Sequence, residues 1–284
     1  MNLILGMIIV FGCVGAGFVL SNGNLAALWH PYELLIICGA AFGAFIIANP
    51  MSVVKKSFSG AMSLIGGSKY NKQIYMDLLT LMFGIFQKAR KEGLMAIEDD
   101  IEEPDSSPLF SEYPKVTKDH HVRDFITDYL RIIVGGNMNP FELENLMDVE
   151  LDNHHHEAGA VPNAITRVSD GLPGFGIVAA VLGIVITMGS LGGPVEEIGA
   201  LVGAALVGTF LGILFAYGFV GPMANQLESR NAEEASFYQV IKVCLMANVN
   251  GYSPQICIEF GRKSMPSAFR PSFSDMEAHL KEQK

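Results

Sequence analysis

The sequence predicts an all-α integral membrane protein with four transmembrane helices and a helical cytoplasmic domain. Half of its 284 residues are apolar, and four apolar runs approach the length of about 20 residues that a helix needs to cross a bilayer. The charged residues are segregated from these runs, because no lysine or arginine precedes Lys55 and none lies between Arg167 and Arg230. Such a pattern indicates membrane spans joined to a charged body rather than one globular core.

The first two apolar runs cover residues 2–20 and 33–50. The first run has no basic residues before it, and it is longer than the apolar core of a typical signal peptide. Both features favour a retained helix over a cleaved leader. The second is short enough to be a buried core helix. An odd number of spans would place one charged segment on the wrong side of the membrane. We therefore assign residues 1–50 to two transmembrane helices.

Two further runs, at about residues 171–191 and 198–222, form a hairpin whose only charges lie in its connecting loop. Ionisable groups within a membrane usually mark an ion path. The apolar cores of these runs offer only the hydroxyl groups of Thr187, Thr209 and Tyr217. A hydroxyl group does not relay a proton by titrating near neutral pH. If residues 171–222 line a proton path, the titrating carboxylate belongs to another polypeptide.

Pairs of glycines lie within these runs, and prolines lie at the ends of the last two. Glycines four residues apart let helices approach closely, within one chain or between chains. Three such pairs occur: Gly39 with Gly43, Gly199 with Gly203, and Gly208 with Gly212. Pro173 opens the third run and Pro222 closes the fourth. Both are expected at the cytoplasmic boundary, where proline either marks a helix end or forms part of a hinge.

The distribution of basic residues predicts the orientation of the chain. Loops 21–32 and 191–198 contain no lysine or arginine, whereas Lys55 follows the second run closely and Arg167 precedes the third. Cytoplasmic loops carry the excess of basic residues. We therefore expect both short loops outside, and the long segment and both termini in the cytoplasm.

Segments 51–170 and 223–284 together form the predicted cytoplasmic part. Apolar residues recur at helical spacing in several stretches. The expected helices cover residues 69–92, 121–135, 140–156 and 225–250. Gly93 is a plausible stop for the first of them. The last segment, 271–284, is expected to be a frayed polar tail.

Composition and motifs exclude several classes of function. A net charge of −10 argues against nucleic acid as a partner. The run of three histidines at 154–156 is expected to be a solvated surface rather than a metal site, because neighbouring helical residues point in different directions. No phosphate-binding loop or nucleophile elbow occurs in an appropriate context. We expect no enzyme and no cofactor.

A charged band lies beyond the first cytoplasmic helix. Arg90 and Lys91 precede an acidic cluster that begins at Glu98 by about two helical turns. Such a band is usually a solvated surface, although a basic pair followed by acids can also present a charge pattern to a protein partner.

Five long motifs occur in order along nearly the whole chain: SKYNKQIYMDLL, DFITDYLRIIVGGNMNPFELENLMD, LPGFGIVAAVLGIV, VGTFLGILFAYGFVGP and NVNGYSPQICIEFGRK. Through them the chain resembles the A subunit of the bacterial flagellar motor stator, the MotA family. The TolQ and ExbB energisers of envelope processes share the last two membrane helices more loosely, but they usually have three membrane helices. A TolQ- or ExbB-like energiser is the alternative interpretation.

The resemblance implies a concrete assembly. MotA-like subunits form a homopentameric ring in the inner membrane around two helices of a B subunit, which is anchored to peptidoglycan and carries the ion-binding aspartate. The third and fourth helices line the pore. Proton influx through this channel turns the ring, which pushes the rotor protein FliG.

The resemblance also implies roles for particular residues. By motif match, Arg90 and Glu98 fall on the rotor-interacting charges, and Pro173 and Pro222 fall on the prolines that couple ion flow to movement.

The expected pore-lining residues are Ala180, Thr209 and Tyr217. Thr209 matches a pore-facing threonine of the family, and Tyr217 adds a hydroxyl group. Sodium-driven relatives carry threonine where this chain has Ala180, and a bare sodium ion needs oxygen ligands. The alanine therefore favours protons over sodium as the coupling ion.

Overall fold

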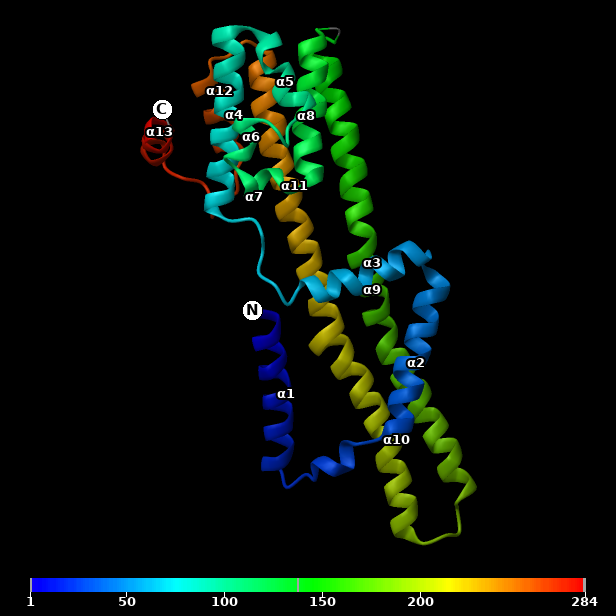
Figure 1. Cartoon of the computed structure of the whole chain (residues 1–284). Coiled ribbons are helices and arrows are strands. Elements are labelled where there is room, and N and C mark those ends of the chain that lie inside the picture. The colour runs from blue at the N-terminus through cyan, green and yellow to red at the C-terminus, as the bar shows by residue number, and fades with distance from the viewer. Residues whose placement is uncertain (1, 137, 283–284) are drawn as a thin grey trace. The chain divides into compact units, whose positions relative to one another are not determined.

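The computed structural model describes residues 2–136 and 138–282, and these are helical with short connections and contain no strand (Figure 1). The elements are α1 (Asn2–Leu20), η1 (Leu25–Leu28), α2 (Pro31–Ala48), α3 (Met51–Ser63), α4 (Lys72–Glu92), η2 (Leu94–Ile97), α5 (Glu98–Glu102), α6 (Pro108–Ser111), α7 (Pro114–Thr117), α8 (His120–Gly135), α9 (Pro140–Gly189), α10 (Val195–Phe215), the π-helical turn η3 (Ala216–Val220), α11 (Gly221–Val249), α12 (Pro254–Ser264) and α13 (Phe273–Glu282).

The chain divides into two compact units. The membrane unit contains the residues up to Gly67 and His156–Arg230, and the head unit contains Ser68–His155 and the residues from Asn231 onward. The long helices α9 and α11 contribute to both units.

Four helical segments of the described chain are long and apolar enough to cross a membrane, which confirms the predicted number. In the first of them, none of the span Leu3–Leu20 is buried within the chain. Its side chains Leu5 and Ile8 are 58% and 63% exposed. Faces so apolar suit contact with lipid or with other membrane helices.

Helix α9 differs from the sequence expectation. We expected a helix ending near residue 156 and a membrane helix opening at Pro173, but α9 runs without a break from Pro140 to Gly189, with Pro162 and Pro173 inside it. Ending one helix and starting another leaves about four carbonyl and four N–H groups without helical partners. The two internal prolines remove only two N–H donors, and membrane helices tolerate such a loss. The continuous helix is therefore the less costly arrangement.

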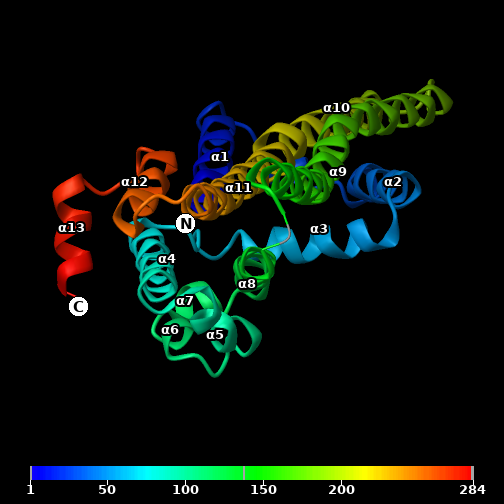
Figure 2. The ribbon, with the colours of Figure 1, turned by 90° about the horizontal axis from the view of Figure 1, so that it is seen from above.

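The head unit is built on an apolar core formed by α4, α8, α11 and α12, in which Tyr75, Phe86 and Phe237 are at most 1% exposed. Helix α4 begins where the Asn71 side chain accepts a hydrogen bond from the Ile74 N–H, 3.1 Å away. It ends at Gly93, whose φ of 95° suits glycine alone. The short helices α5, α6 and α7 lie between α4 and α8 (Figure 2), with α5 against α8 and α6 against α4.

The end of the chain is more ordered than its sequence suggested. The expected frayed tail is wrong over its described part, because α13 covers Phe273–Glu282. Ser272 and Asp275 cap this helix reciprocally, since the Asp275 N–H donates to the Ser272 hydroxyl and the Ser272 N–H donates to the Asp275 carboxylate. Met276 on the first turn is only 4% exposed, so the helix is also anchored by packing.

A buried arginine in α12 makes the stability of the head unit depend on pH. Arg262, 6% exposed, donates to both carboxylate oxygens of Glu259 at 2.7 and 2.6 Å. This hydrogen bond lowers the pKa of Glu259 from 4.5. A carboxyl group whose pKa is lowered by folding stabilises the protein above its unfolded pKa and loses that contribution as the pH falls through the folded value.

We therefore expect the melting temperature of the detergent-solubilised chain to fall as the pH is lowered below about 4.5, and to fall less steeply in the Glu259→Gln variant. Thermal unfolding of both proteins between pH 3 and 7 measures the difference. Identical slopes in the two proteins would contradict this role for Glu259.

Candidate functional site

The predicted membrane hairpin is held together by a backbone contact between α9 and α10 (Figure 1). A Cβ atom added to Gly212 would lie 2.7 Å from the Leu172 carbonyl oxygen, and one added to Gly176 would lie 2.9 Å from the Gly208 carbonyl oxygen. Contacts this short leave no room for a side chain at either glycine. Of the predicted glycine pairs, Gly208 and Gly212 form this contact.

The other predicted glycine pairs are open within the chain. A Cβ atom added to Gly43, Gly199 or Gly203 would meet no described atom within 4 Å, and one added to Gly39 would touch only its own helix. These glycines therefore play no part in the packing of the hairpin.

Gly176 and Gly183, the partners on α9, were missed. A Cβ atom added to Gly183 would lie 2.8 Å from the Ala205 Cβ. Their spacing of seven residues, two turns of one helix face, was the available signal.

The structure brings two of the three pore-lining candidates to the same contact. A Cβ atom added to Gly208 would lie 3.5 Å from the Ala180 nitrogen, and one added to Gly176 would lie 3.3 Å from the Thr209 Cα. Ala180 and Thr209 are half-buried there. Tyr217 is elsewhere, in the π-helical turn, and is 70% exposed.

The two prolines lie on the two arms of the hairpin. Pro173 is half-buried inside α9, and Pro222 is exposed at the start of α11, directly after the π-helical turn Ala216–Val220. In this turn the Gly221 N–H donates to the Ala216 carbonyl, one residue further than in an α-helix. Such turns are rare and occur frequently at functional sites.

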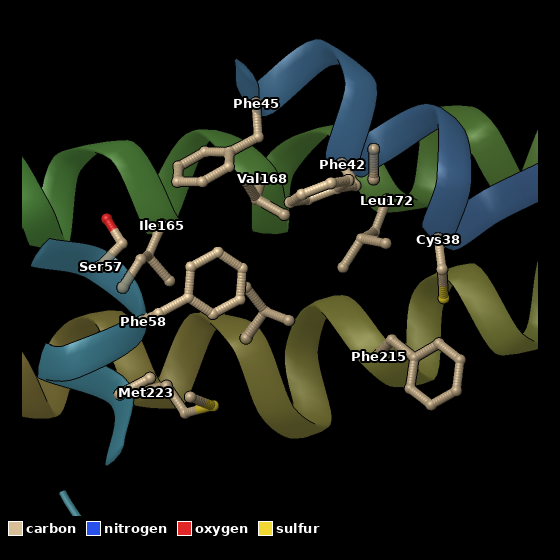
Figure 3. Close-up of a pocket in the computed structure, with 13 residues that line it drawn as sticks. Cys38, Phe42, Phe45, Ser57, Phe58, Ile165, Val168, Leu172, Phe215 and Met223 are labelled. Atoms are coloured by element: carbon tan, nitrogen blue, oxygen red, sulfur yellow. The ribbon is translucent and has the colours of Figure 1, made fainter. Parts of the chain in front are cut away.

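An apolar cavity of about 370 Å³ lies in the membrane unit among α2, α3, α9, the end of α10, the π-helical turn and the start of α11. Figure 3 shows Phe42, Phe58 and Leu172 directed toward it. The hydroxyl group of Ser57, which also lines it, already donates to the Val53 carbonyl at 2.8 Å. The cavity therefore has almost no polar surface with which to bind a polar substrate.

The charged band occupies the end of α4 and the start of α5. Arg90 lies in the last turn of α4 and Glu98 opens α5, and both are exposed. Between them the chain reverses at Gly93 and forms the short turn η2, whose Ile97 is 1% exposed and anchors the connection in the core. The positions of both charges are therefore set by the end of α4 and by a short helical turn anchored in the core through Ile97.

Not every acid of the band reaches the surface. Asp100 is 5% exposed and accepts hydrogen bonds from the Lys88 ammonium at 2.7 Å and the Ser107 hydroxyl at 2.6 Å. The hydrogen bond from Lys88 to Asp100 raises the pKa of the lysine. Glu102 is engaged by Arg131 at 2.8 Å. Of the acids in the band, Asp100 is therefore buried, whereas Glu98, Asp99, Glu102 and Glu103 are exposed.

The histidine run does not form a cluster with other metal-binding side chains. Across residues 2–136 and 138–282, no group of three His, Cys, Asp or Glu side chains is arranged to hold a metal ion. The ring of His154 packs against Tyr238 with centroids 5.0 Å apart.

Two family models match the chain: Motility protein A N-terminal, over residues 4–93, and the MotA/TolQ/ExbB proton channel family, over residues 117–239. The chain is 46% identical over 281 residues to Motility protein A of Salmonella typhimurium, covering 99% of this chain and 95% of that protein.

Two solved structures share the fold. The structure of C. jejuni MotAB matches with a TM-score of 0.79 at 19% identity, over 96% of this chain and 98% of that one. The flagellar MotAB stator complex from Bacillus subtilis matches with a TM-score of 0.72 at 26% identity, over 90% and 92%. The predicted all-helical fold with four membrane helices is thereby confirmed.

Proposed function

The chain belongs to the MotA family, and from that premise we propose that it is a stator subunit of a bacterial flagellar motor which couples proton influx to torque. The observation that supports this most directly is the hairpin of α9 and α10, which packs backbone to backbone and has no Asp, Glu, Lys, Arg or His in residues 171–195 or 198–222. Such a hairpin can surround an ion path but cannot itself carry a titrating proton. The family is one of channels and stators rather than of enzymes.

The titrating carboxylate is proposed to come from a B subunit with which this chain assembles. The related C. jejuni and Bacillus subtilis structures are MotAB complexes. In our proposal, five copies of the chain surround two B-subunit helices, with α9 and α10 facing the pore and Ala180, Thr209 and Tyr217 lining it. The complex lies in the inner membrane, with both termini and the head unit in the cytoplasm.

A charge cycle then drives the movement. When the partner's aspartate is protonated it loses its charge, which changes its preferred contacts in a site of low dielectric constant. Release of the proton on the cytoplasmic side restores the charge. Pro173 and Pro222 transmit each change to the head unit, and the surface charges Arg90 and Glu98 push the rotor protein FliG.

Proton conduction that depends on the B subunit is the decisive test. Expression of both genes should restore swimming to a strain lacking its stators, and neither gene alone should do so. Liposomes containing both subunits should take up protons, and an Asp→Asn change in the B-subunit membrane helix should stop the uptake. Equal uptake by liposomes containing this chain alone would overturn the proposal.

The choice of ion can be measured separately. The methyl group of Ala180 offers no oxygen ligand, so motor speed is expected to stay constant when sodium is varied at fixed pH and to fall when the proton gradient is collapsed. A strong dependence on sodium would show that the coupling ion is not the proton.

Charge reversal at the head unit should reduce torque without reducing assembly. Arg90→Glu places a negative charge where we propose contact with the rotor, and since electrostatic complementarity guides such contacts, stall torque should fall several-fold. An alanine at position 90 should have a smaller effect because Lys91 remains beside it.

Lys115→Glu is the matched control, since Lys115 is also exposed in the head unit and its reversal changes the net charge equally. Unchanged torque in Arg90→Glu, or an equal loss in Lys115→Glu, would remove Arg90 from the rotor contact. Partial recovery with a compensating charge reversal in the rotor would support it.

A further inference from the structure

A buried hydrogen bond joins α9 to the π-helical turn that precedes Pro222. The Ser169 hydroxyl donates to the Ala216 carbonyl over 2.9 Å, between positions 47 residues apart. Ser169 is 4% exposed and Ala216 is fully buried. The same carbonyl accepts the N–H of Gly221, so it receives one bond from its own helix and one from the neighbouring helix.

The two prolines weaken the backbone on either side of this bond. Proline has no N–H, so Pro222 withdraws a donor from the turn Ala216–Val220, and Pro173 withdraws the α-helical donor of the Ser169 carbonyl. Neither loss falls on the Ala216 carbonyl, which already accepts the Gly221 N–H. The Ser169 hydroxyl therefore adds a second bond there and joins two turns whose own backbone bonding is incomplete.

The space around this hydroxyl is closely fitted. A Cβ atom added to Gly221 would lie 3.0 Å from the Ala216 carbonyl oxygen and 3.1 Å from the Ser169 Oγ. Gly221 therefore leaves room for the serine hydroxyl. The same geometry means that a hydroxyl group carried by residue 221 would reach the Ala216 carbonyl if residue 169 had no side chain.

We propose that Ser169 is a positioning residue, whose hydroxyl locks the π-helical turn against α9 and so sets where Tyr217 and Pro222 lie during each motor step. This inference rests on the coupling role proposed above for the prolines. Thr187, also buried on α9, provides a contrast, because its hydroxyl donates to the Gly183 carbonyl of its own helix at 2.8 Å. A hydroxyl bonded within its own helix fixes no second element.

Torque per stator unit separates positioning from stability. When stators return to a motor one at a time, its speed rises by one step for each stator. A variant that only destabilises the chain gives fewer steps, whereas a variant that misplaces the turn gives smaller steps. With the full-length chain and its B subunit, we expect Ser169→Ala and Ser169→Gly to reduce the step size about threefold or more, the equivalent of losing one hydrogen bond. Thr187→Ala should leave it unchanged.

The double variant is the sharpest arm. Ser169→Gly combined with Gly221→Ser leaves a hydroxyl beside the Ala216 carbonyl, but on the helix that carries this carbonyl, so the bond to α9 stays absent and the step size should stay reduced. A full-size step in Ser169→Ala, or in the double variant, would overturn the inference.

Proline variants measured in the same strain keep the two hypotheses apart. If Pro173→Ala and Pro222→Ala both retain full step size, the proposed coupling role of the prolines fails. If they lose it while Ser169→Ala does not, only the role of Ser169 fails.

Discussion

Replacing Gly212 with valine is expected to abolish motility, although the chain will still insert into the membrane. The Cβ atom alone would lie 2.7 Å from the Leu172 carbonyl oxygen and 3.0 Å from the Gly176 Cα, and neither backbone atom can rotate away. Overpacking of this kind costs about 1–3 kcal/mol, so the closed hairpin should be disfavoured by roughly 5- to 150-fold. Swimming, and recovery of the complex with the B subunit on native gels, measure the loss.

Gly203→Val is the matched control, because it adds the same side chain to the same helix at a position where no described atom lies within 4 Å. Thermal unfolding of the detergent-solubilised chain should be unchanged by Gly203→Val and lowered by Gly212→Val. Equal loss in both variants would show that the contact between α9 and α10 is not what holds the hairpin together.

The fold could be predicted where the sequence contains local signals. Gly93 ends α4, and Pro140 marks the start of α9, because caps and breakers act on their immediate neighbours. The same reasoning wrongly predicted a helix start at Pro173, since a proline marks a helix start only when no helix already precedes it. The prediction of a frayed tail was wrong because the capping pair Ser272 and Asp275 was not recognised as the start of a helix.

Contacts between helices were less predictable. In α10 nearly every face is apolar, so hydrophobicity does not show how the helix is rotated about its axis. Glycine spacing identified Gly212 but not its partner Gly176, which requires the register of the second helix. The apolar cavity and the bond from Ser169 to Ala216 depend on several separate segments meeting, and no single stretch of sequence encodes them.

The charged band could also be predicted only in part. Sequence placed Arg90 and Glu98 near each other, and the resemblance to the MotA family supplied their proposed role. Nothing in the acidic run distinguishes Asp99, which is exposed, from Asp100, which is buried against Lys88. That distinction arises from the turn between α4 and α5, whose direction is fixed by packing in the head unit.

Neutralising the acids around Lys242 should destabilise the head unit more than removing the lysine itself. Lys242 on α11 is 6% exposed, and its ammonium group lies 2.6 Å from the Asp148 carboxylate and 3.5 Å from that of Glu144. Both acids are about half exposed, so most of the desolvation cost falls on the lysine. A buried charge that loses its partners costs about 3–5 kcal/mol, whereas replacing a buried ion pair with an apolar side chain of similar volume is often neutral.

The double variant Asp148→Asn with Glu144→Gln leaves the ammonium buried without a counter-charge, so its free energy of unfolding should fall by about 3–5 kcal/mol. In Lys242→Met the charge is absent, and the two acids, already half exposed, can be hydrated. We therefore expect only a small change in that variant. Denaturant unfolding of the purified full chain in detergent compares the two. If Lys242→Met proved the more destabilising, attraction within the triad would outweigh the desolvation of the lysine, and the order of effects argued here would be reversed.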